Sequence, residues 1–238
     1  MKGVITSLLL SLSLSVLGWS ETWTLVKDKN EVQVYTREVA GSEYLEFKGV
    51  TRVKGSVASV VAILYDMPNA PKWLDSCSMG MTVEEVSFEE NYVFENIDLT
   101  FPVSDRKVTL HSQLRWEGDS AYLSVKDANT FCQNKQTKRC AKVMADSALA
   151  VDYAKGLYSI QAISKTQTQI TWVNHTQPGG SVPTWLVNMM VVSLPYNSLL
   201  AMQSMVVEEK YKAMSREQLQ EQWRRQFKKH HKLLILKP

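Results

Sequence analysis

Residue types on which many enzymes and metal sites depend are scarce in this sequence. The 238 residues include three cysteines and four histidines, with no Cys-x-x-Cys pair and no histidine at metal-ligand spacing near the cysteines. A Gly-x-Ser-x-Gly nucleophile motif, a His-Glu-x-x-His metal motif and a glycine-rich phosphate loop are also missing. We therefore predict no metal site, no cofactor and no enzymatic activity. A pair of pocket carboxylates stays open, because it has no sequence signature.

The apolar run near the N-terminus is too short for a membrane anchor. It covers residues 4–17, fewer than the roughly 20 residues that span a bilayer, and it includes several serines. Lys2 precedes the run, and small residues occupy positions 18 and 20, as at a cleavage site. No cysteine follows, which argues against a lipoprotein anchor. We predict that residues 1–20 are a cleaved signal peptide and that the protein is exported to the periplasm or secreted; an uncleaved anchor is the alternative.

Apolar residues are numerous enough to build one sizeable core. Hydrophobic residues make up 45% and aromatic residues 9% of the sequence, and the length fits a single domain. The seven tryptophans and ten methionines are generous for this length. Because methionine is flexible and polarizable, it suits a surface that accepts ligands of variable shape, although methionines also fill ordinary cores. No internal repeat or linker divides the chain.

Periodicity predicts an antiparallel sheet followed by one long helix. Strands are expected over residues 31–39, 44–53, 90–99, 108–116, 122–126, 143–153, 157–163 and 169–176, with a strand-like pattern from residue 81 onward. Ser56 caps a short helix, and a second short helix is expected around Trp73. Gly179 and Gly180 lie in a turn that ends sheet pairing, and Pro183 opens a helix that is apolar on nearly every side.

Two of the cysteines are close together in the sequence. Cys132 and Cys140 flank a polar segment that we expect to form the tip of a hairpin and to bring the two sulfur atoms together. In an oxidising compartment a disulfide between them is favoured. Because the closed loop is short, the bond would rigidify this loop without determining the rest of the fold.

Short strings in one order along the chain resemble the START (StAR-related lipid-transfer) domain. They are residues 32–37, 46–50, 71–73 with Cys77, 101–106, 156–160 and 168–172, followed by Pro178, Gly179, Gly180, Pro183, Trp185 and Asn188. The resemblance covers about residues 21–212. It implies an α+β helix-grip fold, in which a curved antiparallel sheet is closed by a long C-terminal helix around a hydrophobic cavity that holds one lipid. It also implies that Cys77 is a buried, unreactive side chain.

The resemblance and the strand pattern together suggest which residues contact the ligand. Alternation along the last strand puts Ile170, Trp172 and Asn174 on one face, and in the similar phosphatidylcholine-transfer protein the position matching Asn174 touches the lipid. The alternative is that these three are core residues and that His175 is the polar contact. The expected ligand-binding residues are Trp73, Phe101, Arg106, Ile170, Trp172, Asn174, Trp185, Met189 and Met190.

Arg106 is the charged residue in this set. It matches the arginine of the family's Pro-Val-Ser-Asp-Arg-Asp segment. Its guanidinium would either pair with a phosphate or carboxylate headgroup or form a structural ion pair with Asp105. The chain departs from the family at Lys107, where aspartate is usual, and at Ser112 or His111, where sterol-binding members carry arginine. These departures argue against sterol specificity.

The C-terminal segment, residues 213–238, is a basic extension that the family domain does not require. From Ser215 the pattern predicts a capped helix with Leu219, Trp223 and Phe227 near one side. The cations expected to contact anionic headgroups are Arg224, Arg225, Lys228 and Lys229. The alternative is a solvated helix end followed by a disordered tail. We expect no nucleic-acid partner for an exported chain.

These observations predict a monomeric, exported domain over residues 21–212 that binds one phospholipid, sterol or fatty acid and transfers it between membranes. Transfer requires no chemistry, only an opening motion of the final helix and of the loop near Phe101. Two other functions stay open. One is a lipid-sensing module that passes a signal to a protein, and the other is a helix-grip enzyme of the cyclase or hydrolase type that acts on a bound substrate.

Overall fold

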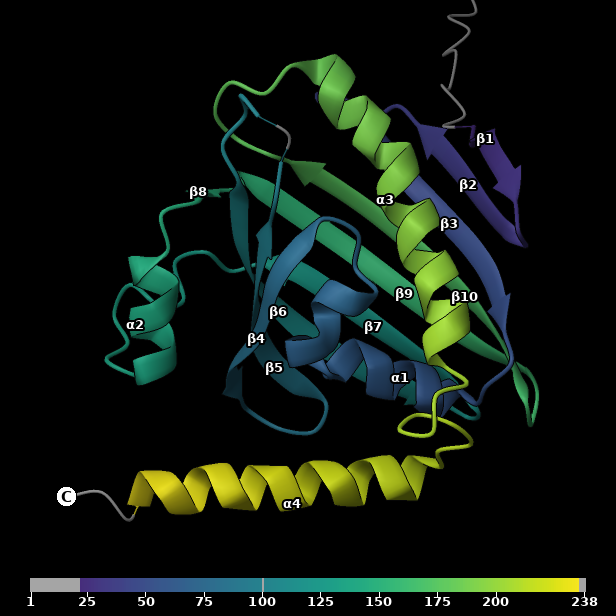
Figure 1. The fold of residues 1–238 in the computed structure, drawn as a ribbon, viewed down its shortest axis with the longest axis vertical. Helices are drawn as coiled ribbons and strands as arrows, with labels where there is room; N and C mark the ends of the chain where they lie inside the picture. The colour runs from purple at the N-terminus through teal and green to yellow at the C-terminus, as the bar shows by residue number, and fades with distance from the viewer. Residues whose placement is uncertain (1–21, 100, 236–238) are drawn as a thin grey trace, which may run out of the picture.

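A curved antiparallel sheet and one long helix lying across it form most of the protein (Figure 1). The computed structural model describes residues 22–99 and 101–235. The strands follow the order β1-β2-β3-β10-β9-β7-β6-β5-β4, with β8 beside β6. Their bounds are β1 Thr24–Lys29, β2 Val32–Arg37, β3 Glu46–Val53, β4 Cys77–Glu85, β5 Glu90–Ile97, β6 Arg106–Glu117, β7 Ser120–Asp127, β8 Leu149–Ala150, β9 Tyr153–Ser164 and β10 Gln167–Gln177. The predicted helix-grip fold is confirmed.

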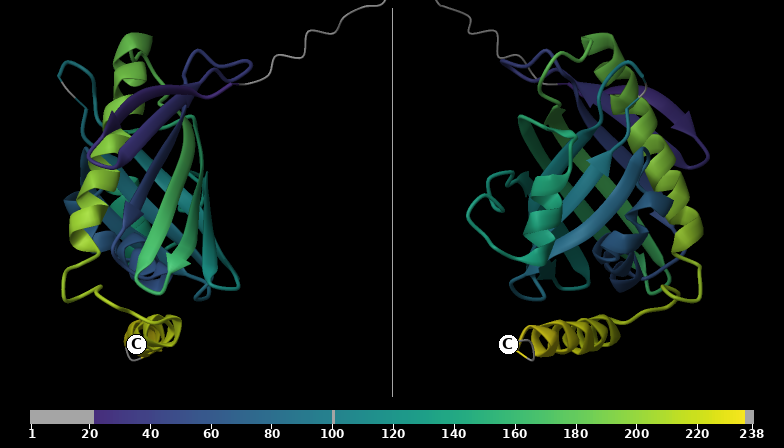
Figure 2. Two further views of the ribbon diagram at one scale, coloured as in Figure 1. Left: turned by 90° about the vertical axis from the view of Figure 1, so that its right-hand side faces the viewer. Right: turned by 60° about the vertical axis from the view of Figure 1, so that its left-hand side comes forward.

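Two helices, α1 and η1, lie at one end of the sheet, α3 lies across it, and α2 and α4 lie outside it. Their bounds are α1 Val57–Tyr65, the 3₁₀ helix η1 Met67–Lys72, α2 Lys138–Ala145, α3 Thr184–Met205 and α4 Arg216–Ile235. Ser56 caps α1 as predicted, because its hydroxyl accepts a hydrogen bond from the Ser59 N–H at 3.0 Å. All eight residues from Val57 to Leu64 are buried. α1 therefore closes the end of the sheet that is opposite to the start of α3 (Figures 1 and 2).

The C-terminal half of α3 is the half that anchors it to the sheet. Leu199 and Met202 are fully buried, and the Ser198 hydroxyl accepts a hydrogen bond from the Asp75 N–H at 3.0 Å. Gly49 on β3 permits this close approach, because a Cβ atom there would lie 2.7 Å from the Leu199 side chain. By length and composition α3 is apolar enough to cross a membrane. In this fold it instead packs against β2 and β3.

The segment around the two cysteines differs from the prediction. No hairpin tip forms between them: Cys140 lies on α2, whose first turn is capped when the Cys140 N–H donates to the Thr137 hydroxyl at 3.1 Å. The expected strand over residues 143–153 is also wrong, since residues 143–145 are helical and the range contains only the two-residue β8 and the first residue of β9. Cys140 and Val143, three residues apart, share the buried side of α2, which is the spacing of a helix face.

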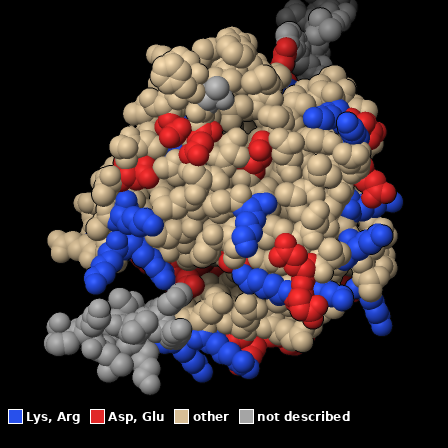
Figure 3. Space-filling model, viewed as in Figure 1, with Lys and Arg blue, Asp and Glu red and all other residues tan. Residues whose placement is uncertain are grey.

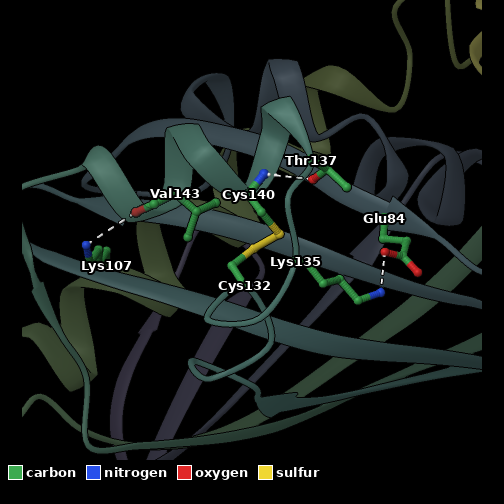
Figure 4. Close-up of a disulfide and its surroundings, with 7 residues drawn as sticks. All are labelled: Glu84, Lys107, Cys132, Lys135, Thr137, Cys140 and Val143. Atoms are coloured by element: carbon green, nitrogen blue, oxygen red, sulfur yellow. Dashed lines mark hydrogen bonds and ion pairs between the residues drawn. A yellow bond between two sulfur atoms is a disulfide. The ribbon is translucent and has the colours of Figure 1, made fainter. Parts of the chain in front are cut away.

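A disulfide joins α2 to the loop that precedes it, next to the outer face of the sheet (Figure 4). The Cys132 and Cys140 sulfur atoms are 2.07 Å apart, so the predicted bond is present in the structure. Both cysteines pack with Val143 against Val83 and Phe94 in a second, small core. The Lys107 ammonium donates to the Asp146 carbonyl at 2.5 Å. Lys107, which stands where the family has aspartate, thus holds the end of α2.

The extension beyond α3 forms a helix whose apolar side faces the protein. Ser215 caps α4: its hydroxyl accepts from the Gln218 N–H, and the Gln218 amide oxygen accepts from the Ser215 N–H. Leu219 is buried. The Trp223 ring lies 5.8 Å from that of Phe88 and 4.7 Å from that of Phe227. α4 lies at the end of the molecule away from the start of α3 (Figures 1 and 2). Residues 1–21, with the predicted signal peptide, are outside the described residues.

Removal of the disulfide is expected to destabilise the protein. A C132S/C140S variant releases a loop of sequence separation 8, and loop-closure entropy predicts a loss of roughly 2.5 kcal/mol in the free energy of unfolding. Urea denaturation of the oxidised wild type and of the variant measures this difference. The reduced wild type is the control, and it should match the variant. Equal unfolding midpoints for the oxidised wild type and the variant would show that packing of α2 alone closes this loop.

Candidate functional site

A largely apolar cavity lies between the concave face of the sheet and the N-terminal half of α3. The volume of this cavity is about 200 Å³. Apolar side chains from α1, η1, six strands and α3 line most of it; among them are Phe47, Leu64, Leu74, Val93, Leu110, Leu123, Val125, Ala154, Val187, Met190, Val191 and Leu194. Such an enclosure shields hydrocarbon from water, at about 0.8 kcal/mol per buried methylene.

The paired strands β5 and β6 arrange the polar groups of the cavity in a row. Their register sets Asn91 opposite Ser112, Val93 opposite Leu110, Glu95 opposite Val108 and Ile97 opposite Arg106. All eight of these residues line the cavity. Because a strand advances about 3.4 Å per residue, the level of Glu95 is roughly 7 Å from that of Arg106, and that of Asn91 is roughly 13 Å further. The row runs from the start of α3 toward α1.

Five of the nine residues expected to bind ligand line the cavity, and they are Trp73, Arg106, Trp172, Asn174 and Met190. The other four do not. Phe101, Trp185 and Met189 are exposed by 93%, 69% and 55%. Successive residues on a helix point about 100° apart, so α3 turns Met190 inward and Met189 outward. Ile170 shares the face of Trp172 but is fully buried in the core, outside the cavity wall.

His175, the alternative polar contact, lies on the other face of β10 from Trp172 and Asn174. Its side chain is 6% exposed, and its ring lies 5.8 Å from that of Tyr153. Neither ring nitrogen has a hydrogen-bond partner within the described ranges. Since His175 is not part of the cavity wall, the arrangement on β10 favours Trp172 and Asn174 as the ligand-facing pair.

Arg106 is buried, and its guanidinium bonds to backbone carbonyls. Its Nε donates to the Pro178 carbonyl at 2.7 Å, Nη2 to the Gly179 carbonyl at 2.9 Å and Nη1 to the Ser104 carbonyl at 2.5 Å. The expected ion pair with Asp105 is absent, because that carboxylate accepts from the Leu99 N–H. In the described part of the chain the Arg106 charge has no carboxylate partner. Its donors instead hold the turn that precedes α3.

The same arginine separates the cavity from a pocket on the outside. That outer pocket is lined by Pro102, Val103, Ser104, Arg106, Leu149, Ser181 and Pro183. The first turns of α3 are fastened on the opposite side, where the Thr184 hydroxyl donates to the Glu43 carboxylate at 2.6 Å and the Leu45 N–H donates to the Asn188 side-chain oxygen at 3.3 Å. We call this end of the cavity, between the turn at 178–183 and the loop at 101–104, the mouth.

Glu95 is a functional candidate that the sequence analysis missed. It faces the cavity and has no hydrogen-bond or ion-pair partner among residues 22–99 and 101–235. Burial raises the pKa of its carboxyl from 4.5 to about 7. The sequence contained a signal for this residue, because Glu95 falls on the same face of a predicted strand as Val93 and Ile97. A buried acid among apolar residues lowers stability unless it has a bonding partner or a function.

Three further polar atoms of the cavity-lining residues have no hydrogen-bond partner in the described part of the chain. They are the Asn91 side-chain oxygen and the indole nitrogens of Trp73 and Trp172. All three are covered by protein atoms, so a ligand in the cavity would not reach them. Cys77 is a plain core residue as expected: burial raises the pKa of its thiol to about 12. An apolar ligand with a hydrogen-bonding atom near Glu95 would complement this cavity.

Comparisons with known proteins agree with this geometry. The START domain family model matches residues 6–197. An uncharacterized protein of Pseudomonas aeruginosa is 29% identical over 187 residues, which are 78% of this chain and 87% of that protein. A STAR-related lipid transfer protein from Xanthomonas axonopodis is 26% identical, with a TM-score of 0.67 over 78% of this chain and 99% of that one. Human STARD10, at 15% identity, shares the fold, with a TM-score of 0.65 over 79% of this chain and 74% of that one. The chain therefore belongs to the START domain family.

Proposed function

We propose that this protein binds one hydrophobic ligand, a phospholipid, sterol or fatty acid, in its cavity and transfers it between membranes. The observation that carries the proposal is the largely apolar cavity whose cation, Arg106, lies at the mouth. An amphiphile would keep its hydrocarbon inside and its headgroup near the guanidinium. The similarity to the lipid transfer protein of Xanthomonas axonopodis supports the same function.

Ligand entry needs the N-terminal half of α3 to move. The cavity of about 200 Å³ is smaller than the roughly 300–1,000 Å³ of typical ligand pockets, so we expect α3 to swing outward when a ligand enters. Pro195 lies inside the helix and lacks the N–H that would bond to the carbonyl four residues earlier. The helix is therefore weakest there. The anchored half after Pro195 stays in place while the half before it opens.

The mouth is also the proposed site of membrane contact. Leu149 in the outer pocket is 49% exposed, and Phe101 and Trp185 adjoin that pocket in the sequence. The top of the face in Figure 3, where α3 begins, carries few charged side chains. Exposed apolar side chains around an opening favour insertion into the interface of a bilayer, where Trp is preferred. Contact there would let the ligand leave without crossing water.

The basic side of α4 is a second proposed contact, for anionic headgroups. Because Leu219 and Trp223 face the protein, only the charged side is open to a membrane. Arg224, Arg225 and Lys228 are exposed there, and Glu221 pairs with the first two. The Lys229 side chain is outside the described residues. Since α4 lies away from the mouth, this contact would hold the protein at a surface without releasing the ligand.

Export fits this function. A carrier that only binds and releases lipid needs no energy source, so it can act in an aqueous compartment between membranes. The Cys132–Cys140 disulfide supports an oxidising location. We propose that the protein acts as a monomer and without chemistry on its ligand. Recovery of the bound molecule chemically unchanged after incubation distinguishes carriage from the enzymatic alternative, and movement of lipid between vesicles distinguishes it from sensing.

Filling the cavity is expected to abolish lipid loading. Met190→Trp adds volume to the cavity wall, whereas Met189→Trp adds the same volume to the exposed side of α3. We expect the Met190 variant to retain less than about a tenth of the lipid that the wild type retains, since overpacking closes the space for hydrocarbon. Native mass spectrometry after incubation with phosphatidylcholine and phosphatidylglycerol vesicles measures the retained lipid.

The Met189 variant is the matched control and should load like the wild type. Circular dichroism and thermal melting of both variants establish that the fold is kept. Equal loading of a folded Met190 variant and the wild type would contradict the cavity as the binding site.

Removal of the apolar side chains at the mouth is expected to slow transfer more than binding. A Phe101→Ser/Trp185→Ser variant loses two exposed aromatic groups that do not line the cavity. We expect transfer between donor and acceptor vesicles to fall by roughly tenfold, with the retained lipid unchanged. Ile163→Ser, at an exposed apolar site in β9, is the control. If the control slows transfer as much as the double variant does, membrane contact is not localised at the mouth.

A further inference from the structure

Glu95 has no part in the transfer described above, yet it occupies the middle of the cavity wall. β5 holds it between Gly80 of β4 and Val108 of β6. Its parity is inward, because Phe94 next to it is fully buried on the outer face with the α2 core. The accessible surface of Glu95 therefore faces the cavity and not bulk solvent. An acid in this position meets whatever fills the cavity.

No positively charged group near Glu95 in the described residues pairs with its carboxylate. Arg106 on β6 is the cation of the cavity wall, but its donors are directed at the carbonyls of the mouth. The other titratable groups facing this region are Tyr158 of β9, Tyr65 of α1 and Cys77 of β4. Burial, and after it the charge of Glu95, raises the pKa of Tyr158, and burial raises that of Tyr65. These three are therefore neutral near pH 7, and the side chains that α3 contributes to the wall are uncharged.

A carboxyl without a cationic partner has two ways to be stable in such a cavity. It either keeps water beside it or stays protonated and bonds to a polar atom of the ligand. The protonated acid offers one O–H donor and one carbonyl acceptor. A hydroxyl or an amide can satisfy both at once, whereas an ester can only accept and a plain hydrocarbon can do neither.

We propose that Glu95, as an uncharged acid, binds a hydroxyl or amide group on the enclosed part of the ligand, and that the protein thereby prefers hydroxy- or amide-bearing lipids over plain hydrocarbon chains. The inference rests on the proposed function and specifies its ligand class. Arg106 then contacts the head of the ligand, and Glu95 contacts a polar atom roughly 7 Å further inside.

Loading should follow the protonation of Glu95. A pKa of about 7 means that the acid is mostly neutral below pH 7 and mostly charged above it. A ligand that displaces water from the carboxyl favours the neutral form, so binding above pH 7 requires uptake of a proton. Affinity is then expected to fall roughly fivefold between pH 7 and pH 8 and to be nearly constant below pH 6.

A competition between matched probes tests the proposal. Phosphatidylcholine vesicles carry equal low amounts of hexadecane, hexadecanol, hexadecanamide and hexadecylamine, and the probes retained by the re-isolated protein are quantified by mass spectrometry. We expect the wild type at pH 6 to retain the alcohol and the amide roughly five- to tenfold over the hydrocarbon. Glu95→Leu should lose this preference. Glu95→Gln should keep it and lose the dependence on pH.

Controls separate the outcomes. Glu209→Gln removes an exposed carboxylate and should behave like the wild type. Thermal melting reports folding of each variant. At pH 8 the wild type buries a charged carboxylate, so Glu95→Gln should melt at a higher temperature than the wild type. At pH 5 the carboxyl of the wild type is neutral, so this difference should disappear. Equal retention of hydrocarbon and alcohol by the wild type, or an unchanged preference in folded Glu95→Leu, would overturn this inference and leave the proposed function in place. Preferred uptake of the amine would overturn it in favour of a cationic ligand. Retention of no probe would count against the proposed function itself.

Discussion

The buried guanidinium of Arg106 joins the sheet to the turn from which α3 begins, and closure of the cavity depends on this junction. Its donors reach carbonyls on both sides of the mouth, at Pro178 and Gly179 on one side and at Ser104 on the other. Carbonyl dipoles compensate a charge less well than a carboxylate does. An anionic headgroup that reaches the mouth therefore competes with the turn for the same donors. Under the proposed function, recognition of the headgroup and release of the turn would be one event.

The two halves of α3 respond differently to that event. After Pro195 the helix is fixed by buried Leu199 and Met202 and by the contact at Gly49. Before Pro195 its ties to the rest of the protein include the two hydrogen bonds from the loop at 43–45 and the turn held by Arg106. Segments with few buried apolar contacts open at the lowest free-energy cost. The half of α3 that would move is thus the half with fewer buried side chains: before Pro195 Leu186 is buried, and Val191 and Leu194 pack against the core while partly exposed.

Strand parity made part of this site predictable from sequence, and helix orientation did not. Burial alternates along β10 up to Val173, so Trp172 and Asn174 could be placed on one face from sequence, whereas buried His175 on the other face left an alternative. α3 is apolar on nearly all sides, and its sequence therefore contains no polar stripe that distinguishes Met190 from Met189. Residues 138–145 were assigned to loop and strand because a short helix is held by its cap and by the disulfide, both of which are tertiary contacts. Glu95 went unnoticed because a charged residue in a strand usually faces solvent.

Glu95 limits which ligands the cavity accepts. Its carboxyl has no hydrogen-bond or ion-pair partner among the described residues, and it lines a largely apolar cavity. A buried polar group that is left unsatisfied costs about 1–3 kcal/mol, which is a sizeable share of the 5–15 kcal/mol by which proteins are usually stable. Under the proposed function, a ligand that bonds to this carboxyl would stabilise the closed protein by mass action. Release would then require an environment that compensates both the hydrocarbon and the carboxyl. The membrane contact proposed at the mouth would supply the first compensation, and water that enters behind the departing ligand would supply the second.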